Sequence, residues 1–195
     1  MTNQKTKGLL VVLSGPSGVG KGTVCQKLDL EALNTRISTS MTTRKPRDGE
    51  VEGLSYYFVS QDDFMKAVEN GEMLEYDCHF SNCYGTPKKP VDALREQGKN
   101  VLLEIDTNGA RQVMEREPDT LSIFLAPPTE QELVKRIIGR GSEDDEQIQQ
   151  RLSKAREELR QQDLYDYVVV NDDLDQTIEE VSRIISERSK NDTSC

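Results

Sequence analysis

Short apolar runs alternate with stretches of helical periodicity along most of the chain. The first run, residues 9–14, ends at a cluster of glycine, proline and serine, and a helical pattern follows from Lys21 to about Leu33. A short apolar run bounded by turn residues is typical of a buried strand. The chain is therefore predicted to open as a strand, a glycine-rich loop and a helix. Further runs with strand character are residues 36–39, 56–59, 73–76, 100–105, 121–125 and 167–171.

The helical stretches between these runs carry start signals. Ser60-x-x-Asp63 and Thr129-x-x-Glu132 both have the pattern of a capping box. Because strands and helices alternate, right-handed crossovers would build a parallel sheet with helices on both faces. The predicted fold class is a three-layer α/β architecture. The longest helical patterns are residues 148–165 and 174–188.

Two segments interrupt this alternation. Between residues 35 and 97 the predicted strands are short and closely spaced, which is typical of a small mixed subdomain inserted into the core. Further on, glycines flank Arg140 and an acidic run follows, which indicates a short lid. The prediction is a single domain over residues 1–195, with a core of residues 1–34 and 98–195, a subdomain at 35–97 and a lid at 139–147.

Composition narrows the classes of function. With 195 residues, of which 34% are hydrophobic and 31% charged, the chain suits one soluble globular unit. No apolar run is long enough for a membrane span or a signal peptide, so we expect a cytoplasmic protein without membrane partners. The net charge of −10 argues against a nucleic-acid binder. A polyanionic ligand would need a local cationic pocket.

The four cysteines, Cys25, Cys78, Cys83 and Cys195, show no spacing typical of a disulfide framework. We therefore expect reduced thiols in a reducing compartment. Cys78 and Cys83, with His79 between them, also suggest a metal site, but no second ligand pair follows at zinc-like spacing. A partly packed histidine is the simpler interpretation.

The glycine-rich loop after the first strand matches the phosphate-binding pattern G-x-x-x-x-G-K. Its glycines let backbone N–H groups fold around phosphate oxygens, and Lys21 can reach the β- and γ-phosphates of ATP. Gly22 stands where the full pattern has a hydroxyl residue, so Thr23 is the candidate to approach Mg²⁺ through water. The predicted ATP-binding residues of the loop are Gly15, Pro16, Ser17, Gly18, Val19, Gly20, Lys21, Gly22 and Thr23.

Several short motifs follow one another in a specific order. They are SGPSGVGKGT from Ser14, TTRKPR from Thr42, YGT from Tyr84, ID from Ile105, GRG from Gly139 and NDDL from Asn171. With these motifs the chain resembles the guanylate kinases over nearly its full length. The resemblance implies a P-loop kinase fold and transfer of the γ-phosphoryl group of ATP to GMP or dGMP, with Mg²⁺ as cofactor.

A basic loop lies early in the predicted subdomain. Arg44 and Arg47 flank Pro46, and guanidinium forks suit the oxygens of a terminal phosphate. Taken alone, such a segment is as often an ordinary basic surface loop. The resemblance implies that both arginines bind the GMP phosphate, helped by the hydroxyls of Tyr56 and Tyr84.

The base of the acceptor nucleotide suggests a role for a carboxylate. Guanine presents N1–H and an exocyclic amine as adjacent donors, so one carboxylate can accept from both, whereas N1 of adenine is an acceptor. The resemblance places Glu75 in this role, with Ser40, Thr86 and Asp106 completing base recognition. Without the resemblance, Glu75 would be interpreted as a solvated surface acid.

The predicted strand at residues 100–105 is followed by acids at its carboxyl end. Glu104 and Asp106 point to the same face because side chains alternate along a strand. Ligands of α/β sheets bind at this end of the strands. We therefore expect Glu104 to hold Mg²⁺, directly or through water. The alternative is that these acids only cap the following helix.

Phosphoryl transfer to GMP needs no general base, because the second phosphate pKa is about 6 and the attacking oxygen is already largely deprotonated. Positioning and charge stabilisation remain as the catalytic task. The resemblance implies that Arg136, Arg140 and Arg151 close over the phosphates and that Asn171 lies on the adenine side. For Arg136 and Arg151, pairing with acids on a helix surface is the simpler alternative.

Two other functions stay open on the sequence. One is a kinase for a different nucleoside monophosphate, chiefly AMP. The other is a non-catalytic guanylate-kinase-like module that binds proteins, although Lys21 in an intact phosphate loop argues against it. The predicted partners are the small molecules ATP and GMP.

Overall fold

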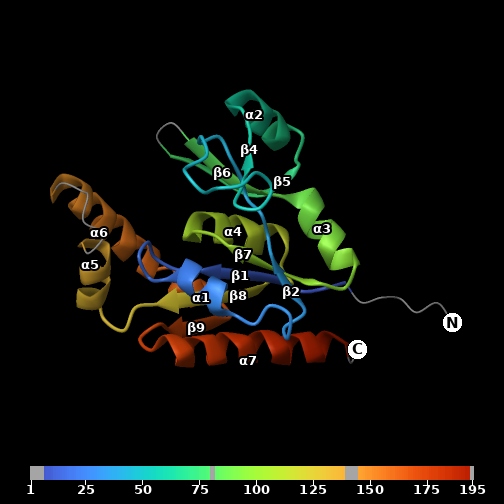
Figure 1. The fold of residues 1–195 in the computed structure, drawn as a ribbon. Coiled ribbons are helices and arrows are strands. Elements are labelled where there is room, and N and C mark those ends of the chain that lie inside the picture. Colours follow the sequence, from blue (N-terminus) through green and yellow to red (C-terminus); the bar gives the residue numbers. More distant parts are fainter. Residues whose placement is uncertain (1–6, 80–81, 139–144, 194–195) are drawn as a thin grey trace.

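The computed structural model describes residues 7–79, 82–138 and 145–193. Its central sheet has five parallel strands in the order β2-β7-β1-β8-β9 (Figure 1). The middle strand is buried along its whole length, as expected for a continuous apolar run in a parallel sheet. The strands are β1 Leu10–Ser14, β2 Thr35–Ile37, β7 Asn100–Glu104, β8 Leu121–Ala126 and β9 Tyr167–Val170.

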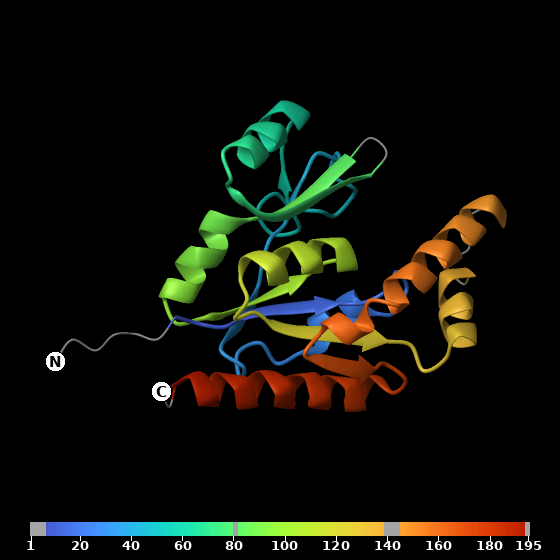
Figure 2. The same cartoon turned by 180° about the vertical axis from the view of Figure 1, so that it is seen from behind.

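Helices cover both faces of this sheet (Figures 1 and 2). Alternate side chains of β1 enter two separate apolar cores, one shared with α1 and α7 and the other with α3 and α4. The predicted three-layer α/β architecture is therefore confirmed. No described helix has an apolar stretch long enough to cross a bilayer. The four helices are α1 Lys21–Lys27, α3 Lys88–Glu96, α4 Thr107–Arg116 and α7 Leu174–Thr193.

A second, four-stranded sheet has the order β4-β3-β6-β5 and mixes parallel and antiparallel pairs. Helix α2, Gln61–Glu69, covers it with the fully buried Phe64, and Ser60 caps this helix by accepting from the N–H of Asp63 at 3.1 Å. The sequence assigned β2 to this subdomain, but buried Thr35 and its neighbours pair with β7 in the central sheet. The strands are β3 Met41–Thr42, β4 Tyr57–Phe58, β5 Met73–His79 and β6 Asn82–Pro87.

Two further helices, α5 Glu130–Ile138 and α6 Asp145–Leu159, pack against each other beside the central sheet (Figure 2). Residues 139–144, which make up most of the predicted lid and include Arg140, lie outside the described residues. The contact between the two helices is apolar and consists of Leu133, Ile137, Leu152 and Ala155.

Several elements differ from the sequence-based prediction. The helix predicted at residues 148–165 is α6, Asp145–Leu159, and a separate 3-10 helix, Gln162–Leu164, follows it. Helix α1 ends at Lys27 rather than near Leu33, because Leu28 adopts an extended backbone and Asp29 accepts from the N–H of Ala32 in a turn. The predicted strand at residues 73–76 is longer and forms a hairpin with β6, which was not predicted. Apolar and polar side chains alternate from Leu74 to His79, but no such alternation marks β6, so its pairing with β5 could not be predicted from an apolar pattern.

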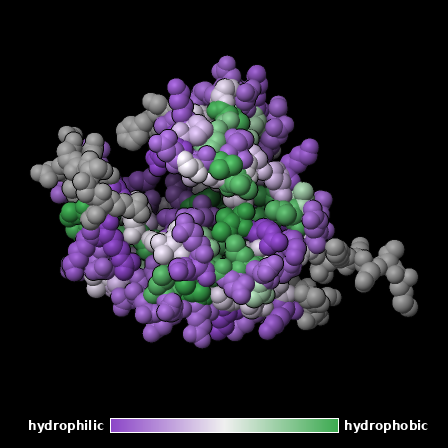
Figure 3. All heavy atoms as spheres, viewed as in Figure 1, coloured by the Kyte–Doolittle hydropathy of each residue, from purple (hydrophilic) through white to green (hydrophobic). Residues whose placement is uncertain are grey.

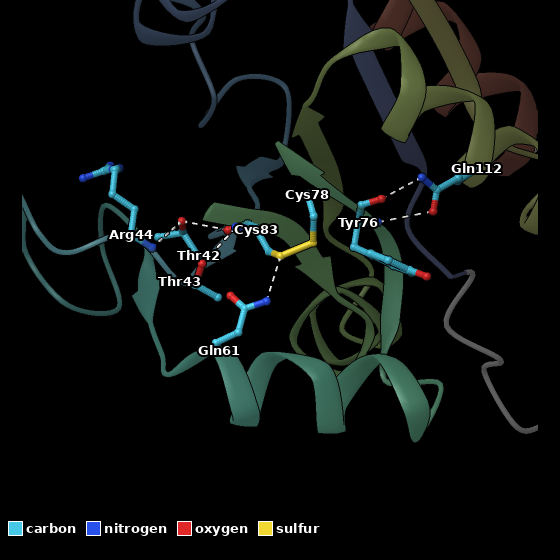
Figure 4. The surroundings of a disulfide bond; sticks show 8 residues. All are labelled: Thr42, Thr43, Arg44, Gln61, Tyr76, Cys78, Cys83 and Gln112. Carbon is cyan, nitrogen blue, oxygen red and sulfur yellow. Dashed lines mark hydrogen bonds between the residues drawn. A yellow bond between two sulfur atoms is a disulfide. The ribbon is translucent and has the colours of Figure 1, made fainter. Parts of the chain in front are cut away.

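The hairpin also contains a disulfide. Cys78 and Cys83 face each other in the register of β5 and β6, with their Cα atoms 4.1 Å apart, and are bonded to each other (Figure 4). The expectation of reduced thiols is therefore wrong for this pair, because antiparallel pairing places the two side chains in direct contact. The bond also removes the two thiolates that the alternative metal site required. Cys25 is free and buried, and Cys195 lies outside the described residues.

Breaking the disulfide should destabilise the protein. The bond closes a short loop, since its cysteines are separated by 5 positions, and the entropy of that closure corresponds to about 2 kcal/mol. A Cys78→Ser, Cys83→Ser double variant should therefore lose about this much free energy of unfolding in denaturant titrations. A reducing agent should weaken the wild type similarly and leave the double variant unchanged. Equal stability of oxidised and reduced wild type would contradict the prediction.

Candidate active site

The phosphate loop connects β1 to α1 and folds back on itself. The ammonium group of Lys21 donates to the carbonyl oxygens of Gly15 at 2.5 Å and of Pro16 at 3.3 Å. Gly20 has a φ of 103°, and a Cβ there would lie 2.7 Å from Nδ2 of Asn171, so only glycine fits without displacement. The loop has the closed, glycine-dependent form that suits a phosphate group.

A cavity of about 380 Å³ lies over this loop. Glu104, at the end of β7, lines it beside Thr23, and a Cβ at Gly22 would lie 3.2 Å from Oε1 of Glu104. A hydroxyl side chain at position 22 would therefore compete with this carboxylate for space. Burial raises the pKa of Glu104, which Lys21 opposes, and desolvation lowers the pKa of Lys21 against the attraction of Glu158 and Glu104.

Two of the predicted site residues support the phosphate loop through hydrogen bonds to backbone carbonyl oxygens. Nδ2 of Asn171 donates to the carbonyl oxygen of Val19 at 2.7 Å, and the Asn171 side chain is buried. Nη1 of Arg136 donates to the carbonyl oxygens of Asn171 at 3.0 Å and of Val19 at 3.4 Å. The pairing of Arg136 with a helix acid, considered from the sequence, is also present, with Glu132 at 3.4 Å. These contacts fix the loop to the end of β9 and to α5.

A second cavity, of about 200 Å³, lies between the small sheet and the end of β7. Figure 3 shows this face of the molecule hollowed below the small subdomain. Glu104 lines this cavity as well as the one over the phosphate loop, so the two cavities meet at its side chain. The residues that line the second cavity are Ser40, Tyr56, Glu75, Asp77, Tyr84, Gly85, Glu104, Ile105 and Asp106.

Glu75 is the most buried carboxylate of the second cavity, with 5% of its surface exposed. Its Oε1 accepts from the hydroxyl of Thr86 at 2.6 Å. Burial raises the pKa of Glu75 to about 7, against the hydrogen bond from Thr86, and the charges of Asp106 and Asp77 raise it further. The interpretation of Glu75 as a solvated surface acid is therefore wrong. A buried acid in the wall of a cavity is suited to recognise adjacent donors of a ligand.

Helix α4 of the core holds β5 and thereby positions Glu75. Gln112 donates to the carbonyl oxygen of Tyr76 at 2.8 Å and accepts from its N–H at 3.3 Å. Asp106 caps this helix through the N–H of Gly109 at 2.9 Å, so the capping role considered from the sequence is real, although Asp106 also lines the cavity. At Gly109 the helix approaches so closely that a Cβ would lie 2.5 Å from Oε2 of Glu75.

The basic loop of the small subdomain holds Arg44 in a fixed orientation. Nη1 and Nη2 of Arg44 donate to the two carboxylate oxygens of Glu50, each at 2.8 Å. The guanidinium carbon lies 5.2 Å from the ring centroid of Tyr56 and 5.8 Å from that of Phe58. The hydrogen bonds to Glu50 raise the pKa of Arg44. The same hydrogen bonds lower the pKa of Glu50 to about 2, and the backbone N–H of Arg47 lowers it further.

Glu50 was not recognised from the sequence, and its removal should have a measurable effect. Without it the Arg44 fork loses its fixed orientation, so Glu50→Ala should raise the KM for GMP by about threefold, in line with the modest strength of an ion pair near the protein surface. The KM for ATP should not change. Asp48→Ala, an exposed acid of the same loop, is the control and should have no effect. An unchanged KM for GMP in Glu50→Ala would count against the positioning role.

The remaining predicted residues are distributed unevenly. Thr86 is buried beside the second cavity, whereas Arg47 is exposed on the basic loop. Arg151 is half-buried in α6. Sequence reasoning also missed Glu158 of α6, whose Oε2 accepts from the N–H of Ser17 in the phosphate loop at 3.1 Å. Its only sequence signal is an acid in a helix rich in charged residues, which does not distinguish it from its neighbours.

Comparison with known proteins decides the family. Residues 7–188 match the family model described as guanylate kinase. The chain belongs to the guanylate kinase family. A guanylate kinase of Lactobacillus johnsonii is 49% identical over 180 residues, covering 92% of this chain and 88% of the relative, and one of Clostridioides difficile is 47% identical over the same shares. The crystal structure of guanylate kinase from Anaplasma phagocytophilum is 36% identical, with a TM-score of 0.75 over 95% of this chain and 88% of that one.

Family membership confirms the fold and the function predicted from the sequence. The fold is that of a guanylate kinase, since the solved relative superposes over most of the chain. The protein is an enzyme with guanylate kinase function, because guanylate kinases are ATP:GMP phosphotransferases. The two alternatives, an AMP kinase and a non-catalytic module, are not favoured by these relatives. The roles of individual residues still depend on the geometry of the two cavities.

Proposed function

We propose that the second cavity binds GMP and that the cavity over the phosphate loop binds ATP, so that the γ-phosphoryl group passes between them to GMP or dGMP. The observation that carries this assignment is the position of Glu104, which lines both cavities. Two substrates bound there would meet beside one side chain, and reacting groups held in contact gain much of their rate from proximity.

On the acceptor side, the proposed base contact is with Glu75. Its carboxylate would accept from N1–H and the exocyclic amine of guanine, while the hydroxyl of Thr86 orients it through Oε1. Ser40 and Asp106 line the same cavity and would complete the contacts with the base. The GMP phosphate would lie toward Arg44, Arg47, Tyr56 and Tyr84. The hydrogen bonds to Glu50 orient the guanidinium group of Arg44 there.

On the donor side, the loop residues 15–23 would bind the phosphates of ATP. Lys21 would exchange its carbonyl contacts for phosphate oxygens and stabilise charge on the transferred group. Arg136 and Asn171 support the loop from behind, and Asn171 would also lie near the adenine. Arg140 and Arg151 are proposed to approach the phosphates from the lid side.

Guanylate kinases use ATP with a divalent metal, and the donor cavity offers residues that fit Mg²⁺. The carboxylate of Glu104 and the hydroxyl of Thr23 line it together, and Gly22 leaves Glu104 the space it needs. The described residues contain no cluster of three or more metal-binding side chains, which agrees with a metal held mainly by nucleotide phosphates and one or two protein oxygens. Bound Mg²⁺ would neutralise charge on the β- and γ-phosphates.

An acceptor-panel assay tests the proposal. ATP would be offered with GMP, dGMP, AMP, CMP or UMP, and ADP formation would be followed by a coupled reaction. Phosphorylation of GMP and dGMP in strong preference to the others is the expected result. A preference for AMP would overturn the assignment of Glu75. A role in purine nucleotide metabolism in the cytoplasm follows from these substrates as part of the same proposal.

A further inference from the structure

Helix α6 buries one carboxylate against the phosphate loop. Glu158 has 4% of its surface exposed, although the helix that carries it is largely polar. Its Oε2 accepts from the N–H of Ser17 at 3.1 Å, and its Oε1 lies 4.0 Å from the ammonium group of Lys154. A buried carboxylate is costly unless it is paired and hydrogen-bonded, so a side chain held in this way indicates a specific role.

The partner of Glu158 is part of the proposed ATP site. Ser17 lines the cavity over the phosphate loop, and 141 positions of sequence separate it from Glu158. Burial lowers the pKa of Lys21, and Glu158 opposes this shift more than Glu104 does. One side chain from α6 thus contacts the loop backbone and adds negative charge near the loop lysine.

The position of α6 in the fold suggests a role for this contact. Figures 1 and 2 show the second half of α6 running toward the central sheet, and Leu152 and Ala155, in the middle and second half of the helix, pack with α5. Arg151 lies about two helical turns before Glu158, so both side chains lie on the same side of α6. A helix proposed to bring an arginine to the phosphates is therefore attached, on that same side, to the loop that would bind them.

We propose that Glu158 is a positioning residue that fixes the phosphate loop to α6 through the N–H of Ser17 and thereby sets the affinity for ATP. The inference rests on the proposed function, because it assumes that this loop binds ATP. Glu158 is not expected to touch the nucleotide. Its carboxylate holds the loop in the conformation that binds phosphate, and it fixes the position of α6 relative to that loop.

Glu158→Ala tests the proposal by removing the acceptor. Loss of a charge-assisted hydrogen bond should raise the KM for ATP by about tenfold, while the KM for GMP changes by less than about twofold. Hydrogen exchange of the nucleotide-free protein should show faster exchange in a peptide that covers the phosphate loop. A merely structural role would lower stability and disturb both KM values alike.

Glu158→Gln provides the rescue variant, because its amide oxygen can still accept from Ser17 and its shape should preserve the fold. Its KM for ATP should lie within about threefold of the wild type. Glu157→Ala, an exposed acid on the same helix, is the matched control and should behave as wild type. These comparisons also apply if Glu158→Ala proves too unstable to assay, since failure of the glutamine variant to keep ATP affinity would overturn the proposal.

Three further results, all with Glu158→Ala, would overturn the inference and leave the proposed function unaffected. They are an unchanged KM for ATP in Glu158→Ala, an equal rise of both KM values, and a fall in the KM for ATP, which would make Glu158 a competing anion. Failure of the proposed function is distinct, because it would appear as a lack of GMP phosphorylation by the wild type in the acceptor panel.

Discussion

Replacement of Lys21 by methionine should lower kcat by about 10²- to 10³-fold, the range found when one preorganised charge-stabilising donor is removed from an active site. Lys21 is held by the carbonyl oxygens of Gly15 and Pro16, so its ammonium group is already ordered within the loop. Methionine preserves most of the length and the apolar character of the stem but cannot stabilise negative charge on the transferred group. The loss should appear mainly in turnover rather than in the KM for GMP.

Steady-state kinetics with varied ATP and GMP would measure this effect. Lys27→Met, an exposed lysine at the end of the same helix, is the control and should keep wild-type turnover. Both variants should have similar melting temperatures, so that the loss of activity cannot be assigned to unfolding. Near-normal turnover in Lys21→Met would refute the phosphate role of the loop lysine.

Glu75→Gln should lower kcat/KM for GMP by about 10²-fold and leave the low activity with AMP nearly unchanged. The glutamine amide keeps one acceptor oxygen but turns an N–H₂ group toward a donor of guanine, and a buried polar group without a partner is costly. The ratio of the kcat/KM values for GMP and AMP is therefore the measurement. Glu72→Gln, an exposed acid just before β5, is the control. An unchanged acceptor spectrum would move base recognition away from Glu75.

The same variant should alter the pH dependence of stability. The pKa of Glu75 is about 7 in the folded protein and about 4.5 as its ordinary value, so the unfolded chain releases this proton first as the pH rises. Folding stability should therefore fall between about pH 4.5 and 7, by about 3 kcal/mol for this group. Denaturant titrations across this range should show a smaller fall for Glu75→Gln than for the wild type.

Ligand binding should have the opposite pH dependence. Only the ionised carboxylate can accept from both donors of guanine, so GMP affinity should improve as the pH rises through about 7. The GMP phosphate also titrates, near pH 6, and contributes to the profile. The difference between wild type and Glu75→Gln isolates the part that belongs to Glu75. Identical profiles would mean that the carboxyl group does not contact the base.

The core of the fold could be predicted because local patterns dictate it. β1 and β8 are buried along their length, and continuous apolar runs mark such strands. The phosphate loop could be predicted for a similar reason, since its glycines and Lys21 act through backbone geometry that the sequence states directly. The caps at Ser60 and Thr129 formed as predicted, because they involve residues three positions apart.

The features that could not be predicted depend on contacts between segments that are distant in the sequence, or on the register of paired strands. Cys78 meets Cys83 only because the hairpin has one particular register. Glu158 meets Ser17 only after α6 has packed beside the sheet, and nothing in the spacing of the two residues suggests it. The burial of Glu75 is of the same kind, because α4 covers it from the core. For that residue, resemblance to a family supplied what the local sequence could not.

The close approach of Gly109 to Glu75 restricts how acceptor choice can change. A single methyl group at position 109 would overlap the carboxylate, so a larger residue there requires a shorter or reoriented side chain at position 75. The two positions form a coupled pair across the boundary between core helix and inserted subdomain. Redesign toward another base can therefore begin at position 75, whereas a larger residue at position 109 has to be accompanied by a change at position 75.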